Sequence, residues 1–152
     1  MTREKLEELE EFDQLKTKVL KYVLYKKRTE KEIRQKFAEN AGNLLDNVIE
    51  YLREENYIND EVYLQRSINE IKNLKNLSLK EVKYKLLAKG VSSNLIDHYI
   101  YSNKEEMLEY EVNSAKSIVT KKCNIMEKED IINFLRKKGY LEETIKLAYE
   151  DF

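Results

Sequence analysis

The segment EENYINDEVYLQR, residues 54–66, decides how the fold is divided. It contains neither proline nor glycine, yet it interrupts two helical patterns, because Asn56, Asn59 and Asp60 have short polar side chains that compete for nearby backbone groups. Tyr57 and Ile58 lie between these residues and are apolar. We therefore interpret the segment as a joint between two packed units of the same kind, with the Tyr57–Ile58 pair buried.

The composition of the 152-residue chain predicts an all-α protein. It has no proline, 3 glycines, 38% charged and 41% hydrophobic residues, and this scarcity of helix breakers favours long helices over strands. No apolar run approaches the length that spans a bilayer, and residues 1–12, MTREKLEELEEF, are too polar for a signal peptide. Since Cys123 is the one cysteine, we expect a protein of the reducing cytoplasm without membrane contact.

The charge alternates in sign along the chain with a period near fifty residues. Residues 14–40 hold 9 basic and 3 acidic side chains, residues 43–63 hold 1 and 6, and residues 64–90 hold 7 and 2. The net charge of −1 argues against a uniformly basic nucleic-acid-binding protein. The basic bands could nevertheless follow a phosphate backbone while the acidic bands meet a protein partner.

A repeat of the same length is visible in the residue pattern. Thr29, Ser78 and Glu127 are separated by 49 residues, and the segments around them read RTEKEIRQKFAENAG, LSLKEVKYKLLAKGV and IMEKEDIINFLRKKGY. The spacing indicates tandem structural units, each too small to bury a large core without its neighbour.

Helix starts and stops recur in this register. The segments Thr29–Glu32 and Ser78–Glu81 have the Ser/Thr-x-x-Glu pattern of a capping box that opens a helix. Gly90 and Gly139 follow basic last turns and suit a left-handed helix end. Each unit is therefore predicted to contain a first helix, a short capped second helix and a third helix.

We predict an N-terminal helical extension at residues 1–15 and three-helix repeats at residues 16–59, 60–103 and 104–152, with joints near Asn59 and Asn103. Apolar residues three or four apart define one buried face on each helix. The residues expected on the buried faces of the first helices are Val19, Leu20, Val23, Leu24, Leu64, Ile68, Ile71, Met107, Leu108, Val112, Ala115 and Val119. Those expected on the third helices are Val48, Ile49, Leu52, Leu95, Ile96, Tyr99, Ile145, Ala148 and Tyr149.

From Leu20 to the C-terminus the chain resembles the RecX family, the regulators of the bacterial recombinase RecA. The resemblance rests on RTEKEIRQKF, VIEYLREENYINDEVYLQR, VKYKLLAKGV and NFLRKKGY, in the order and spacing of the family's repeats. Asn56 stands where the family usually has glycine in the joint, a change that the left-handed region tolerates. The chain also has KNLKNL where family members often have a glycine-containing basic loop.

The resemblance implies an elongated, curved all-α molecule of three tandem three-helix repeats. It implies a monomeric, non-enzymatic regulator that binds in the groove of the RecA filament on single- or double-stranded DNA. Such regulators inhibit the recombinase, ATPase and co-protease activities of RecA and so modulate DNA repair, recombination and the SOS response. No cofactor is implied.

Nine basic residues are candidates for phosphate contact: Lys72, Lys75, Lys80, Lys83, Lys85, Lys89, Arg28, Lys31 and Arg34. Around the capped helix after Ser78 only two acids lie nearby in sequence, so most of its lysines are expected to lack ion-pair partners, although a solvated face is the alternative reading. Arg136, Lys137 and Lys138 fit binding and a helix C-terminus equally well.

Two further groups of side chains are candidates for a role at the surface. The acidic residues Asp46, Glu50, Glu54 and Glu55 are candidates for contact with RecA, and a solubilising surface is the equal alternative. Tyr84 is expected to be an exposed ring beside phosphate. The tyrosines expected in the core instead are Tyr51, Tyr57, Tyr99 and Tyr149.

Other functions are open to comparison on the same residues. One histidine (His98), one cysteine and three scattered glycines give no metal cluster, Cys–His pair or phosphate loop, so an enzyme is not expected. A helix-turn-helix-like transcriptional regulator would need base-reading side chains on a recognition helix, whereas the candidate third helices are acidic. A helical protein–protein adaptor would show no salt-dependent DNA affinity.

Overall fold

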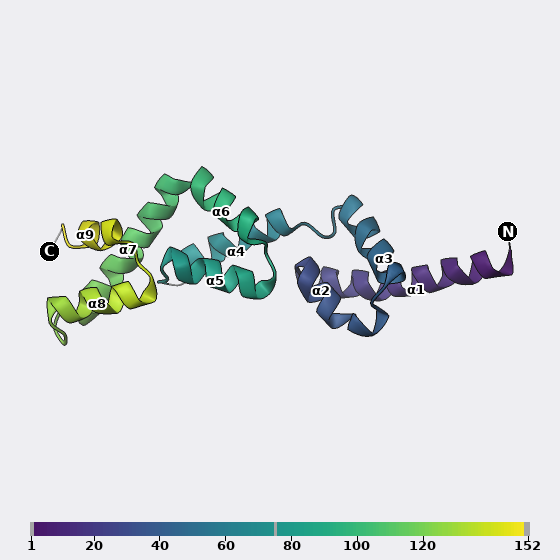
Figure 1. Cartoon of the computed structure of the whole chain (residues 1–152), viewed down its shortest axis with the longest axis horizontal. Coiled ribbons are helices and arrows are strands. Elements are labelled where there is room, and N and C mark those ends of the chain that lie inside the picture. The colour runs from purple at the N-terminus through teal and green to yellow at the C-terminus, as the bar shows by residue number, and fades with distance from the viewer. Residues whose placement is uncertain (1, 75, 151–152) are drawn as a thin grey trace. The chain divides into compact units, whose positions relative to one another are not determined.

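The computed structural model describes residues 2–74 and 76–150, and in that part of the chain every regular element is a helix (Figure 1). The α-helices are α1 (Arg3–Tyr25), α2 (Glu30–Lys36), α3 (Asn43–Glu54), α4 (Asp60–Leu74), α5 (Leu79–Lys89), α6 (Ser93–Ser102), α7 (Lys104–Lys122), α8 (Lys128–Lys138) and α9 (Glu142–Ala148), with a 3-10 turn at Ala38–Asn40. The all-α prediction is confirmed, and so is the long N-terminal helix.

The chain divides into two compact units. The first runs to Tyr63 and also includes Lys89–Val91, and the second holds Leu64–Ala88 and the residues from Ser92 onward. The predicted boundaries at residues 1–15, 16–59, 60–103 and 104–152 stay a prediction. The helices α4 and α7 do begin at Asp60 and Lys104.

In the first unit the core lies between α1 and α3. The long helix contributes Leu15, Val19 and Val23 to this core, three residues spaced four apart. From α3 come the buried residues Leu45, Val48, Ile49 and Leu52. The prediction that Leu24 is buried is wrong, because its side chain is 64% exposed. Leu24 follows Val23 directly, and one residue along a helix turns the side chain by about 100° away from the core face.

The joint after α3 is a left-handed helix end. Asn56 has φ 62°, and the Tyr57 N–H donates to the Leu52 carbonyl at 2.8 Å, the 6→1 bond of a Schellman motif. The next helix is capped by Asn59, whose Oδ1 accepts from the N–H groups of Glu61 and Val62 at 3.1 and 3.2 Å. Asn56 therefore occupies the left-handed position at the helix end that is usually taken by glycine.

Only half of the apolar pair in this joint is buried. Ile58 is 3% exposed and belongs to the core of the first unit, whereas Tyr57 is 42% exposed. The prediction for Tyr57 is wrong, because α3 ends at the left-handed Asn56 and, of the two residues that follow, only Ile58 joins the core. Tyr51 is also exposed, while Tyr99 and Tyr149 are half-buried.

In the second unit one core cluster lies on α7, α8 and α9 and the turn between the last two helices. Its buried members are Ala115, Ile118, Val119, Ile131, Leu135, Tyr140, Ile145 and Ala148. Both predicted capping boxes are present: Thr29 and Glu32 exchange bonds at the start of α2, and Ser78 and Glu81 do so at the start of α5. The predicted left-handed glycines are present as well, since Gly90 has φ 103° and Gly139 has φ 97°.

Candidate nucleic-acid interface

Four of the candidate lysines lie on α5, namely Lys80, Lys83, Lys85 and Lys89. The first three belong to the second unit, and Lys89 belongs to the first. This helix turns Val82 and Leu86 into the protein interior, where they are 1% and 2% exposed. Lys80, Lys85 and Lys89 are exposed, and Lys83 is half-buried. The helix therefore presents exposed cationic residues beside its apolar contacts, with Lys80 farthest from the packed face.

The N-terminus of α5 is fixed by a buried carboxylate that the sequence reasoning missed. Glu111 on α7 is 0% exposed, and its Oε2 accepts from the Leu79 N–H at 2.6 Å. Its Oε1 accepts from the Leu141 N–H at 3.1 Å and from the Thr144 hydroxyl at 2.6 Å. One carboxylate thus joins α5, α7 and the start of α9. Burying a charge is tolerated here because it receives three hydrogen bonds.

Other buried or half-buried hydroxyls lie near enough to Glu111 to feel its electrostatic influence. The Tyr140 and Ser114 hydroxyl oxygens lie 2.7 Å apart, and burial raises the pKa of Tyr140 far above its ordinary value. The Tyr110 hydroxyl accepts from the Leu77 N–H at 3.1 Å, and burial raises the pKa of Tyr110 as well. Both phenols therefore stay neutral hydrogen-bonding groups at physiological pH.

Two of the candidate lysines have acidic partners. Lys83 Nζ lies 2.7 Å from Asp97 Oδ1 on α6, and Lys72 forms an ion pair with Glu106 on α7. The expectation that these lysines lack ion-pair partners is wrong for Lys83 and Lys72. Their partners come from later helices rather than from nearby sequence. Ion pairs at the protein surface, such as these two, contribute about 0–1 kcal/mol to stability.

The remaining candidates on this surface differ in their surroundings. Tyr84 is 59% exposed, as predicted for a ring on the surface, and Lys80 Nζ lies 5.8 Å from its centroid. The stem of Lys80 also packs where a Cβ on Gly139 would lie. Lys75 lies outside the described residues.

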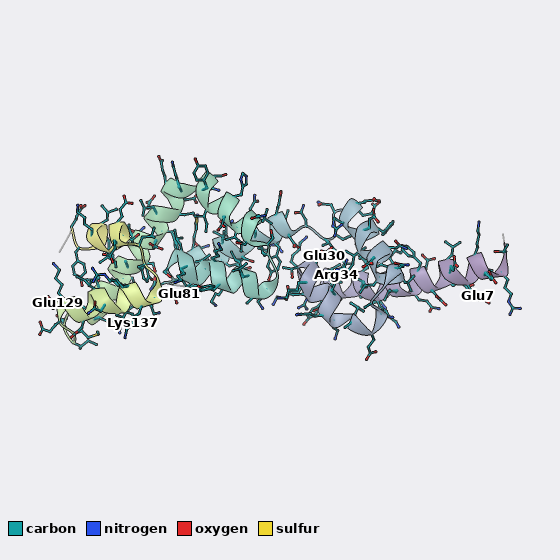
Figure 2. The ribbon with its side chains drawn as sticks, in the orientation of Figure 1. Glu7, Glu30, Arg34, Glu81, Glu129 and Lys137 are labelled. Carbon is teal, nitrogen blue, oxygen red and sulfur yellow. The ribbon has the colours of Figure 1, made fainter. Side chains whose placement is uncertain are left out.

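Of the first-unit candidates, Arg28 and Arg34 contact neighbouring side chains. Arg34 contacts Asp46 at 2.7 Å and Glu30 at 3.9 Å, and Figure 2 labels Glu30 and Arg34 on α2. The Arg28 guanidinium lies 4.2 Å from the Tyr22 ring centroid, while Lys31 is exposed. Arg34 and Asp46, one from each candidate group, are thus paired with each other. The other acidic candidates on or beside α3, namely Glu50, Glu54 and Glu55, are exposed.

The basic end of α8 has structural contacts. Arg136 binds Glu142 through two hydrogen bonds of 2.5 and 3.1 Å, and this contact lowers the pKa of the Glu142 carboxyl. Lys138 Nζ lies 3.8 Å from Glu81. For Arg136 and Lys138 these pairs favour the structural interpretation over a binding one.

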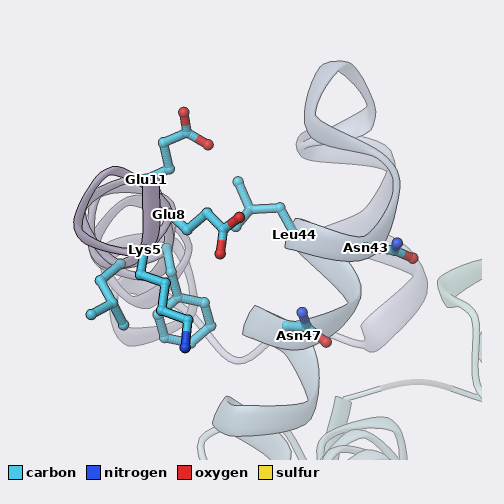
Figure 3. Close-up of a pocket in the computed structure, with 8 residues that line it drawn as sticks. Lys5, Glu8, Glu11, Asn43, Leu44 and Asn47 are labelled. Atoms are coloured by element: carbon cyan, nitrogen blue, oxygen red, sulfur yellow. The ribbon is translucent and has the colours of Figure 1, made fainter. Parts of the chain in front are cut away.

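A groove of about 540 Å³ opens between α1 and α3 in the first unit (Figure 3). Leu9, Phe12 and Leu44 supply its apolar surface, and the polar side chains around them are Lys5, Glu8, Glu11, Asn43 and Asn47.

In the described part of the chain no group of three His, Cys, Asp or Glu residues could hold a metal ion. No helix among the described residues is long and apolar enough to cross a membrane.

The chain is similar in sequence to several proteins named "Regulatory protein RecX". It is 33% identical over 134 residues to that of Staphylococcus haemolyticus, an alignment that covers 85% of this chain and 50% of the relative. For Clostridium perfringens (strain 13) the values are 32%, 86% and 65%, and for Clostridium beijerinckii they are 30%, 91% and 68%. The chain thus spans about half to two thirds of the length of these relatives. No family model matches.

The fold is also similar to that of a solved structure. The crystal structure of RecX from Lactobacillus salivarius superimposes with a TM-score of 0.79 at 19% identity, covering 94% of this chain and 97% of that one. At this identity the superposition supports the arrangement of helices.

Proposed function

The chain belongs to the RecX family, and from this membership we propose that it regulates a bacterial RecA recombinase. In this proposal it binds the RecA filament on DNA as a monomer, lowers the ATPase, strand-exchange and co-protease activities of RecA, and catalyses no reaction itself. The relatives that bear the name of regulatory proteins support the general role.

The observation that carries the DNA contact is the surface of α5. Lys80, Lys85 and Lys89 are exposed on a helix that packs into the protein through Val82 and Leu86. Because Glu111 and Ser78 bind the first turn, the cations are held on a fixed support. Because the backbone that carries these lysines is already ordered, binding to phosphates adds no cost for forming the helix.

The exposed acids of α3 disfavour a base-reading regulator. Glu50 and Glu54 are exposed one turn apart on this helix, and both would be repelled by the phosphates that line the major groove. We assign this surface, together with Glu55, to contact with the protein component of the filament.

The test compares two double variants in a RecA ATPase and strand-exchange assay. Lys80→Gln with Lys89→Gln removes two charges from α5, and Lys5→Gln with Lys146→Gln removes two from exposed positions elsewhere. The parent protein and the control variant should slow RecA equally. The α5 variant should inhibit less, and its binding to duplex DNA should lose roughly 0.9 units of logarithmic salt slope for each phosphate contact removed.

The outcomes separate two parts of the proposal. A parent protein that leaves RecA activity unchanged at every molar ratio would refute the regulatory role for this chain. Equal inhibition by both double variants across all salt concentrations would keep that role and remove α5 from the DNA contact. Circular dichroism of both variants should match the parent, because the substituted lysines are exposed.

A further inference from the structure

The last residue of α1 is a tyrosine whose ring is almost fully exposed. Tyr25 is 87% exposed and lies outside the stripe of Leu15, Val19 and Val23 that packs into the core. A ring in this position contributes little to folding, because it buries almost no apolar surface. It is also a rigid flat surface that is free to meet a planar ligand.

The surroundings of this ring are cationic. Residues 14–29 hold six basic side chains and no acidic one. Lys18 and Lys21 lie seven and four residues before Tyr25, which puts all three on one side of the helix. Lys26 and Lys27 follow directly, the first in an extended conformation with φ −156° and ψ 141°. All four lysines are exposed, so the chain on both sides of Tyr25 presents positive charge to the solvent.

The neighbouring ring is already engaged inside the protein. Tyr22 is half-buried. It packs edge-on against Phe37, with 5.8 Å between ring centroids, and the guanidinium of Arg28 lies 4.2 Å from its centroid. Tyr25, one turn further along, shows the contrasting case of a ring in solvent.

We propose that Tyr25 is a stacking platform for a base of single-stranded DNA, with Lys18, Lys21, Lys26 and Lys27 contacting the flanking phosphates. A single strand is the ligand of choice because its bases can leave their stack and expose a face, whereas duplex bases cannot. The positive charge of the site complements the phosphates and disfavours a basic partner. The inference rests on the proposed function and gives it a strand preference.

The experiment measures binding of fluorescent dT20 and of a 20-base-pair duplex to the whole chain without RecA. Tyr101 supplies a matched control, since it is 73% exposed but is followed by Lys104, Glu105 and Glu106. We expect Tyr25→Ala to weaken dT20 binding about tenfold or more and to change duplex binding less than about twofold. Tyr25→Trp should keep or strengthen dT20 binding, and Tyr101→Ala should change neither.

Three results would overturn the inference. They are no binding of dT20 by the parent, equal dT20 affinity for Tyr25→Ala and Tyr101→Ala, and equal losses on dT20 and duplex in Tyr25→Ala. Equal losses on both ligands would show that the Tyr25 ring maintains the structure of the surface and does not stack on a base. Because RecA is left out of this assay, failure of the regulatory role and failure of the stacking site give different results.

Discussion

The Ser78 hydroxyl donates a 2.7 Å hydrogen bond to the backbone carbonyl of Lys138, sixty residues later in the chain. It thereby joins the start of α5 to the end of α8 within the second unit. Thr29 makes the same contact in the first unit, where its hydroxyl donates to the Lys89 carbonyl, also sixty residues away. Each hydroxyl oxygen also caps its own helix. In both units a side-chain hydroxyl thus serves the local helix start and a contact with a residue sixty positions later.

The variant Ser78→Ala should lose both of these contacts. The cap on the Glu81 N–H and the bond to the Lys138 carbonyl both disappear, and Ser78 is 0% exposed, so water cannot replace them. We expect a loss of about 2 kcal/mol in the free energy of unfolding measured in urea. Ser102→Ala, at an exposed position on α6, should change it by less than about 0.5 kcal/mol. Equal values for the two variants would show that the hydroxyl contributes nothing.

Gly139 meets Lys80 at the same contact between α5 and α8. A Cβ at Gly139 would lie 2.7 Å from Lys80 Cδ and 2.8 Å from Lys80 Cβ, and the backbone has φ 97°. Gly139→Ala should therefore cost more than the roughly 1–2 kcal/mol of left-handed strain alone. Gly139→Asn lowers the backbone part of this cost, because asparagine adopts positive φ more readily than alanine, as Asn56 does at φ 62°. If Gly139→Asn unfolds at the same temperature as the parent protein, the close approach to Lys80 does not affect stability.

Glu111 should be the most sensitive acidic residue of the second unit. Glu111→Ala would leave the N–H groups of Leu79 and Leu141 and the Thr144 hydroxyl without their acceptor in the interior. Each unsatisfied buried group costs about 1–3 kcal/mol, so a loss of roughly 3 kcal/mol or more is expected in urea unfolding. Glu109→Ala, at an exposed position on the same helix, provides the comparison and should stay within about 0.5 kcal/mol of the parent.

Local features could be predicted from the sequence because both partners lie within one helical turn. The Ser78–Glu81 box, the left-handed Asn56 and the two glycine helix ends are of this kind. Glu111 could not be predicted, since its three donors lie 30 to 33 residues away. A weak signal existed: Met107, Glu111, Ser114 and Ile118 are three or four residues apart and share one buried face.

The same distinction applies to the candidate site. Cationic helix positions could be identified from the order of lysines, but their partners could not. Asp97 and Glu106, which pair with Lys83 and Lys72, lie 14 and 34 residues further on. The outward direction of Leu24 and Tyr57 was also missed, because hydropathy alone does not say which of two adjacent apolar residues faces the core.

Asp60 should make the stability of the first unit depend on pH. Burial raises the pKa of its carboxyl, with Arg53 opposing and Glu32 reinforcing the shift. Because the folded pKa exceeds the unfolded value of 3.8, the stability that Asp60 adds when protonated is lost as pH rises through the folded pKa. Asp60→Asn cannot ionise, yet its amide oxygen can still accept from the Glu30 N–H, as Asp60 does at 3.3 Å.

The free energy of unfolding of Asp60→Asn should therefore gain on that of the parent as pH rises from about 4 to about 7. Urea unfolding at several pH values measures this difference. Glu61→Gln, one residue later and exposed, serves as the control for removing a charge from the same turn. A constant difference between Asp60→Asn and the parent over this range would contradict the effect of burial.

Charge-reversal variants of Lys83 and Asp97 can distinguish a phosphate contact made by Lys83 from its ion pair with Asp97. Their side chains meet at 2.7 Å across α5 and α6. Lys83→Glu alone places two carboxylates together and should weaken both the fold and the binding of DNA. Adding Asp97→Lys restores an ion pair and the net charge, so the unfolding free energy should return to within about 0.5 kcal/mol of the parent.

If Lys83 contacts a phosphate, the double variant should still bind duplex DNA more weakly than the parent, with a logarithmic salt slope smaller by roughly 0.9. Full recovery of DNA binding together with stability would show that Lys83 acts only through Asp97, and the phosphate contacts of α5 would then be those of its exposed lysines.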